Sequence, residues 1–332
     1  MRLPPGCGPV SRLMAELLTG RRPADGALST VAVPSGPVTG DRDVQLALWM
    51  AYELSYRGFD DVDDGLEWSA DVLRLRGSLE DAFEHELRAA TRPRLEQAPD
   101  DGSIGDRLLR LVEDDDGPRL SAYLRRDASW EQMCDFLRER SVQQLKESDP
   151  QSFLLPRLTG SAKVALAEIQ YDEYGGGRAD HLHQHLYAEA MTAVGLDASY
   201  GAYVEEISAV SLASANVMSL FALHRRLRAC GIGHFAAFEA SSPVPSRRIA
   251  AGLDRLGMPD ATAAYFLEHV EADSVHEQVA ARDLCGAFVD DHPDSVDDVL
   301  FGAACALHLD ALSGEEILAR WAVADASEGL AS

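Results

Sequence analysis

The sequence has few basic residues and few cysteines. Lys and Arg total 30 against 55 Asp and Glu, which gives a formal net charge of −25. This surplus of negative charge opposes binding to phosphate backbones and to anionic membrane surfaces. The five cysteines are odd in number and lack CxxC-type spacing, which argues against a disulfide framework and a zinc ribbon. We therefore expect no nucleic-acid partner, and a reducing, cytoplasmic location.

The sequence also lacks long apolar runs. No stretch of about 18 apolar residues occurs, and the N-terminal "MRLPPGCGPVSRLMAELLTG" has no unbroken apolar core of signal-peptide length. Hydrophobic residues nevertheless make up 46% of the chain, enough for a sizeable core. We expect a globular protein that neither crosses nor binds a membrane.

The hydrophobic spacing predicts an all-α protein. Residues 1–42 are rich in Pro, Gly, Ser and Thr and are expected to form a flexible arm, with a short helix possible near Ser11 to Leu18. Apolar residues then recur at helical spacing in 43–100, an N-terminal helical subdomain, and in 101–332, a helical bundle. No convincing alternation of period two is present, so no strand is expected.

Several helix boundaries are visible in the sequence. Ser129 and Gln132 form a capping box that opens a helix, Pro150 ends it, and Glu147 is expected in its last turn. Longer helical segments are expected over 162–195, 208–240, 259–289 and 295–321. "YGGGR" interrupts the first of these, and because each glycine costs roughly 1 kcal/mol inside a helix, the backbone is expected to bend there.

The stretch "EHVEADSVHEQ", residues 268–278, places three potential metal ligands on one helix face. His269, Asp273 and His276 fall at about 0°, 40° and −20° around a helix. Such a spacing arises by accident in roughly one sequence of this composition in twenty. Imidazole and carboxylate ligands together suit Fe, Mn or Zn. The neighbouring acids Glu268, Glu271 and Glu277 are expected to be solvated.

A second histidine cluster, "DHLHQHLY", contains His181, His183 and His185. On a helix, His181 and His185 share one face and His183 lies on the opposite one. Asp180 and His183 have the spacing of a D-xx-H pair, similar to the E-xx-H motifs of ferritin-like di-iron bundles, although Asp has the shorter reach. Single histidines of this kind are more often surface or core residues than ligands.

Together, "LKESDPQSFLLPRLTGSAKVALAEIQYDEYGGGRADHLHQHLYAEAM", "GIGHFAAFEASSPVPSRR" and "EHVEADSVHEQ" resemble the haem-oxygenase-like di-iron oxidase and oxygenase superfamily of iron-containing redox enzymes. The resemblance covers roughly residues 43–324. It implies a haem-oxygenase-like bundle with an N-terminal helical extension, and two iron ions held by side chains without haem. The ligand set that it implies is Glu147, Glu173, His183, Glu239, His269, Asp273 and His276.

One detail of that ligand set is checked by geometry. Ten residues of regular helix would put Glu173 about 15 Å from His183, too far for both to serve one metal pair. The three glycines between them remove this objection, because they let the chain turn. Asp180 is the local competitor to Glu173 as the ligand.

The resemblance also implies a function. With its additional Glu, the seven-ligand set is similar to the N-oxygenase branch, which suggests O₂-dependent N-oxygenation of a small amine or amino acid in specialised metabolism. The alternative is an oxidase that cleaves or desaturates an amino or fatty acid. A haem oxygenase and a non-catalytic binding protein of the same fold are weaker alternatives. An external electron donor is a possible partner, and the helices of 43–95 are expected to contribute to a homodimer.

Overall fold

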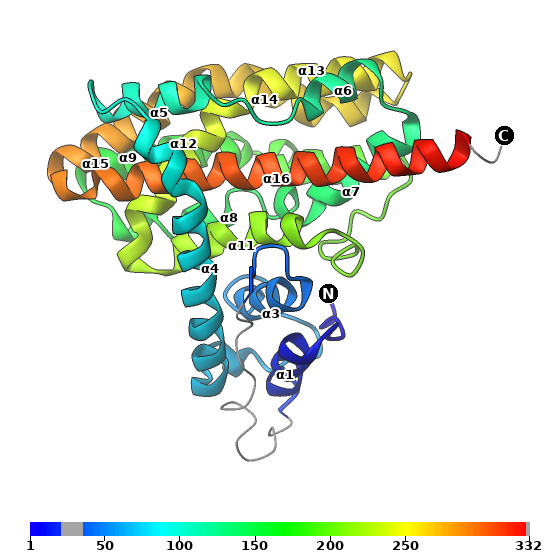
Figure 1. Cartoon of the computed structure of the whole chain (residues 1–332), viewed down its shortest axis with the longest axis horizontal. Coiled ribbons are helices and arrows are strands. Elements are labelled where there is room, and N and C mark those ends of the chain that lie inside the picture. Colours follow the sequence, from blue (N-terminus) through cyan, green and yellow to red (C-terminus); the bar gives the residue numbers. More distant parts are fainter. Residues whose placement is uncertain (21–35, 330–332) are drawn as a thin grey trace.

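The computed structural model describes residues 1–20 and 36–329, with the side chains of all of these except 271–274 and 324–329. Within these ranges the chain is all-helical and has no β-strand, so the predicted fold class is confirmed (Figure 1). The α-helices are α1 (Pro9–Leu18), α3 (Arg42–Glu53), α4 (Ala70–Gln97), α5 (Ile104–Glu113), α6 (Leu120–Arg126), α7 (Trp130–Gln144), α8 (Asp149–Ser152), α9 (Gly160–Glu173), α10 (His183–Ala193), α11 (Ala209–Leu223), α12 (Arg228–Ser241), α13 (Pro243–Arg255), α14 (Asp260–Gln278), α15 (Cys285–Asp291) and α16 (Val296–Gly329).

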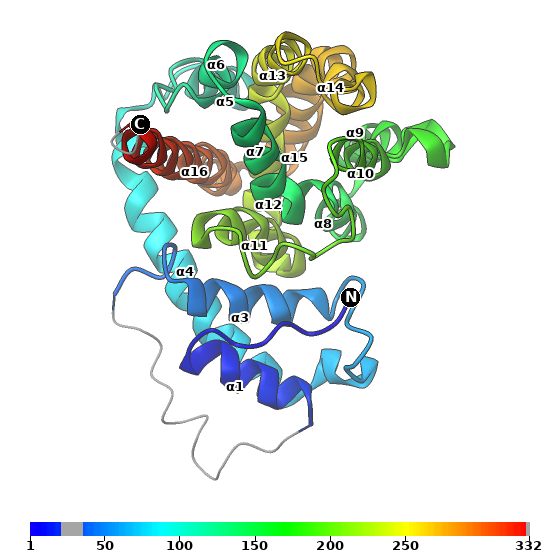
Figure 2. The same cartoon turned by 90° about the vertical axis from the view of Figure 1, so that its right-hand side faces the viewer.

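Helices α1 and α3 form a layer below the bundle, and α4 rises from this layer to the side of α16 (Figure 2). Within the arm expected over residues 1–42, the short helix near Ser11 to Leu18 is present as α1 (Pro9–Leu18), and its apolar face is buried against α3. Asp43 accepts hydrogen bonds from the backbone N–H groups of Val10 and Ser11 and so satisfies the N-terminus of α1. Residues 21–35 of the expected arm lie outside the described residues.

One apolar cluster joins this layer to the bundle. It runs from α1 and α3 through Phe83 of α4 to α11 and to Phe301 of α16. The boundary between residues 43–100 and 101–332, and the dimerisation expected of the former, stay predictions. None of the described helices is long and apolar enough to cross a bilayer.

In the bundle, α12 packs closely against α16 because glycines lie at the crossing. A Cβ atom on Gly233 would collide with the carbonyl oxygen of Val299, and one on Gly302 would collide with that of Cys230. Only glycine lets the two backbones come this close. The contact fixes α12, which carries Glu239, against the longest helix of the bundle.

Two of the expected long helices contain breaks that the sequence analysis did not predict. The segment 208–240 is divided between α11 and α12 at His224, whose backbone is extended (φ −104°, ψ 116°). The segment 259–289 contains a π-helical turn, Val279–Leu284, between α14 and α15. Such π turns are rare in α-helices and are frequent near functional sites.

Candidate metal centre

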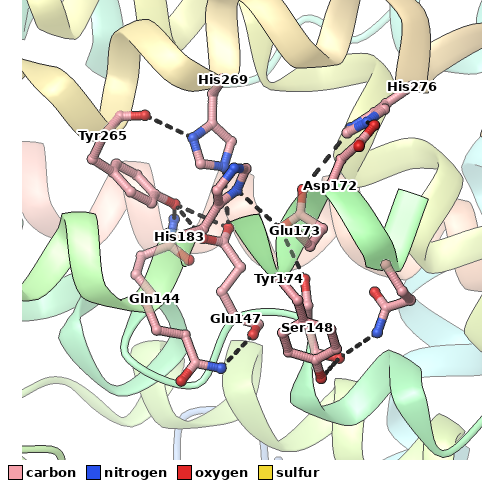
Figure 3. A network of polar contacts seen from close by, with 12 residues as sticks. Gln144, Glu147, Ser148, Asp172, Glu173, Tyr174, His183, Tyr265, His269 and His276 are labelled. Atoms are coloured by element: carbon pink, nitrogen blue, oxygen red, sulfur yellow. Dashed lines mark hydrogen bonds and ion pairs between the residues drawn. The ribbon is translucent and has the colours of Figure 1, made fainter. Parts of the chain in front are cut away.

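Six buried acidic and histidine side chains meet between the helices of the bundle. Figure 3 labels all of them except Glu239. They form two groups, in each of which one donor atom per residue lies within 4.8 Å of the others. The groups are Glu147, Glu173, His183 and His269, and Glu173, Glu239 and His276. Because Glu173 belongs to both groups, the arrangement would suit two neighbouring metal ions that share one carboxylate.

Glu147 lies in a turn between helices. The sequence had predicted it in the last turn of a helix, and that prediction is wrong. Helix α7 ends at Gln144, and Glu147 lies in the four-residue turn before α8. The next residue, Ser148, has φ 67° and is the one non-glycine residue with a positive φ among those described. This strained conformation directs its hydroxyl to Glu173, where Oγ donates to Oε2 at 2.8 Å.

Glu173 and His183 meet because the chain turns between them. Gly175, Gly176 and Gly177 all have positive φ (71°, 61° and 82°), a conformation that glycine adopts without steric cost. Helix α10 then begins at His183, whose Nδ1 lies 3.1 Å from Oε2 of Glu173. The turn expected at the glycines is therefore present.

His269 is oriented by the backbone of its own helix. Its Nδ1 lies 2.8 Å from the carbonyl oxygen of Tyr265, which can only accept, so Nδ1 carries the hydrogen. The lone pair of Nε2 is then directed at the centre, 3.4 Å from Oε1 of Glu147. Tyr265 also donates its hydroxyl to both oxygens of Glu147 at 2.9 Å. Burial, and then the charge of Glu147, raise the pKa of Tyr265 well above its usual value, so this hydroxyl remains a donor.

His276 has carboxylates on both sides of its ring. Its Nε2 lies 3.2 Å from Oδ2 of Asp172, and its Nδ1 faces the second group, 3.3 Å from Oε2 of Glu239 and 3.9 Å from Oε1 of Glu173. With a metal ion in the second group, Nδ1 would present its lone pair to that ion and Nε2 would carry the hydrogen that Asp172 accepts.

The donor set fits metal cations. Imidazole nitrogens and carboxylate oxygens face one another at 3.1–3.9 Å in both groups, an arrangement that needs a proton or a cation between them. Burial by itself would raise the pKa of Glu173, but the charge and hydrogen bond of protonated His183, with smaller contributions from His269 and Ser148, outweigh burial and lower it. The site therefore stabilises Glu173 as a carboxylate when positive charge lies beside it.

Of the remaining candidates, those whose side chains are described lie outside the two groups. Asp273 lies on α14, but its side chain is outside the described residues, as is that of Glu271. Asp180 is exposed and pairs with Arg178 at 3.0 Å, so it does not replace Glu173. The side chains of His181 and His185 are 41% and 48% exposed, and His185 lies beside Glu189. Glu268 and Glu277, expected to be solvated, are half-buried.

The sequence did not identify the residues that hydrogen-bond to the candidate ligands. Ser148, Asp172 and Tyr265 each contact a member of the two groups. Tyr265 lies four residues before His269, and this spacing could have suggested a shared face. Ser148 and Asp172 are next to candidate ligands in the sequence, where helical periodicity gives no indication of contact.

A surface groove of about 1110 Å³ between α5, α9 and α15 is lined by none of the six candidate ligands.

Comparison with known proteins agrees with this centre. No curated protein matches the chain. A family model described as iron-containing redox enzyme matches residues 134–311, just over half of the chain, and this range includes all six grouped residues. With its haem-oxygenase-like helical fold and buried Glu and His groups, the chain belongs to the iron-containing redox enzyme family.

Proposed function

We propose that the protein is a non-haem di-iron, O₂-dependent N-oxygenase that acts on a small amine or amino acid. The observation that carries this proposal is the position of Glu173, which belongs to both donor groups. This residue belongs to the seven-ligand set that, with its additional Glu, resembles the N-oxygenase branch. A shared carboxylate supports a pair of metal ions in preference to two independent ones.

The composition of the centre supports iron. Three imidazoles and three carboxylates are described in the two groups, and Asp273 would add a fourth carboxylate from α14. Four carboxylates balance the charge of two Fe(II) ions. Mixed nitrogen and oxygen donors of this kind suit iron, whereas Mg²⁺ and Ca²⁺ favour oxygen alone.

The proposed reaction is R–NH₂ + O₂ + 2 e⁻ + 2 H⁺ → R–NHOH + H₂O. An N–O bond forms, the O–O bond breaks, the second oxygen leaves as water, and an external reductant supplies the two electrons. When bound, the iron pair would supply O₂ activation. The chain itself orients the ligands: Ser148 holds Glu173, and Tyr265 holds both Glu147 and His269.

The proposed partners follow from charge and packing. A net charge of −25 favours approach of a cationic amine over an anionic substrate. We also propose a homodimer that involves the layer of α1, α3 and α4. Sedimentation of the full chain as a monomer at micromolar concentration would contradict the dimer without affecting the proposed chemistry.

The proposed activity is tested by anaerobic loading with Fe(II), followed by rapid mixing with O₂ and a panel of amines and amino acids. Mass spectrometry with ¹⁸O₂ should show a product that keeps all carbons and gains one labelled oxygen on nitrogen. Loss of CO₂ or a carbon fragment would instead assign oxidative cleavage. Fewer than two iron ions per chain, with no O₂-dependent optical change, would overturn the di-iron assignment. Glu168→Ala, an exposed site on α9, is the control variant.

A further inference from the structure

We propose that Asp172 is a positioning residue that completes the second metal position by holding His276. This inference rests on the proposed di-iron assignment. Oδ2 of Asp172 lies 3.2 Å from Nε2 of His276, and the opposite ring nitrogen faces Glu239 and Glu173. Asp172, His276 and the metal position therefore form a series of the carboxylate–histidine–metal type.

The carboxylate determines which nitrogen can bind a metal. Asp172 only accepts, so once a cation occupies the side of Nδ1, Asp172 stabilises the tautomer with hydrogen on Nε2 and the lone pair on Nδ1. It also prevents rotation of the ring away from Glu239. A negatively charged acceptor makes the imidazole a stronger donor to a cation than a neutral acceptor does.

Each of the two positions contains one histidine from α14, and the two histidines are oriented by different partners. His269 is held by the carbonyl oxygen of Tyr265, a backbone group of the same helix. His276 is held by a side chain from another helix, α9, and this side chain is 52% exposed. The second position therefore depends on the contact of Asp172 with His276 at the edge of the buried centre, whereas the α14 histidine of the first position is held within its own helix.

This difference can be measured without enzyme activity. Anaerobic titration of the apo protein with Fe(II), followed by counting bound iron, should give two ions per chain for the unmodified protein. In Asp172→Ala the second ion should bind about 10–100-fold more weakly, and the first should bind as before. Asp172→Asn, which keeps an oxygen acceptor, should restore part of the affinity. Glu168→Ala removes an exposed acid one helical turn away on the same face of α9 and should bind both ions normally.

A double variant tests whether Asp172 acts through His276. In a His276→Ala background, Asp172→Ala should cause no further loss of Fe(II) affinity. Wild-type affinity for both ions in Asp172→Ala, or additive losses in the double variant, would overturn the positioning role. Binding of fewer than two ions by the unmodified protein would instead overturn the proposed function. Circular dichroism of each apo variant checks that the helices are intact.

Discussion

The ammonium group of Lys146 forms an ion pair with the carboxylate of Glu53, and the two side chains are only 1% and 0% exposed. Tyr200 donates its hydroxyl to the same oxygen of Glu53 at 2.7 Å, and Nζ of Lys146 lies 4.2 Å from the centre of the Tyr56 ring. Lys146 directly precedes Glu147. The pair therefore ties the turn that carries a candidate ligand to α3, in the layer below the bundle.

This pair predicts an asymmetric response to mutation. Lys146→Met should lower the free energy of unfolding by about 3–5 kcal/mol, because it leaves the buried carboxylate of Glu53 without its cation. The double variant Lys146→Met, Glu53→Leu should recover most of that loss, since both charges are gone. Urea unfolding of the apo proteins measures both values. A double variant no more stable than the single one would contradict the ion pair as the cause.

A second prediction concerns Ser148, where backbone strain lowers the stability of the protein and the side-chain hydrogen bond raises it. Ser148→Ala keeps the positive φ of 67° and removes the donor to Glu173, so it should destabilise the protein by about 1–3 kcal/mol. Ser148→Gly loses the same hydrogen bond but relieves strain of about 1–2 kcal/mol. Chemical unfolding should therefore rank Gly above Ala in stability. The reverse order would show that the left-handed backbone is not strained.

Local signals predicted much of the fold. The capping box of Ser129 and Gln132 is present at the start of α7, and the turn at "YGGG" is where the glycines placed it. Both features depend on residues close together in the sequence. For the same reason, the stripe of "EHVEADSVHEQ" could be identified on its helix, and both of its histidines are buried in the centre.

The features that the sequence did not reveal depend on distant contacts. No Gly or Pro marks the break at His224, where α4 supplies the partners: Glu80 lies 2.9 Å from His224, and Glu84 lies 2.6 Å from Arg226. The contact of Asp172 with His276 joins residues 104 positions apart. Helical spacing describes one helix at a time and carries no information on such pairs.

The shared position of Glu173 leads to a third prediction, on iron binding. Glu173→Gln should weaken both iron positions, because it removes a donor from each group. Glu239→Gln should weaken one position only, and the loss there should exceed the roughly 10–100-fold that follows removal of an outer partner. Anaerobic Fe(II) titration with iron counting separates these outcomes. One iron bound at full affinity in Glu173→Gln would contradict a shared carboxylate.

His234 provides the last prediction, on stability in acid. It is fully buried on α12, and burial lowers its pKa from 6.5 to about 4. Below pH 6.5 the unfolded chain binds a proton at this residue that the folded protein does not bind, so stability falls as the pH decreases toward 4 and this loss stops below pH 4. The shift corresponds to about 3 kcal/mol.

The variant that tests this effect is His234→Gln, which cannot take up the proton in either state. It should be less stable than the unmodified protein at pH 7.5, because it alters a packed site beside Phe221. As the pH decreases from 7.5 to 4, the unfolding free energy of the variant relative to that of the unmodified protein should rise by about 3 kcal/mol. His185→Gln, at a side chain that is 48% exposed, is the matched control for removal of a histidine. A difference that stays constant with pH would show that His234 does not oppose folding in acid. Measuring both proteins without metal keeps the candidate ligands equal in the comparison, so their own titration cancels.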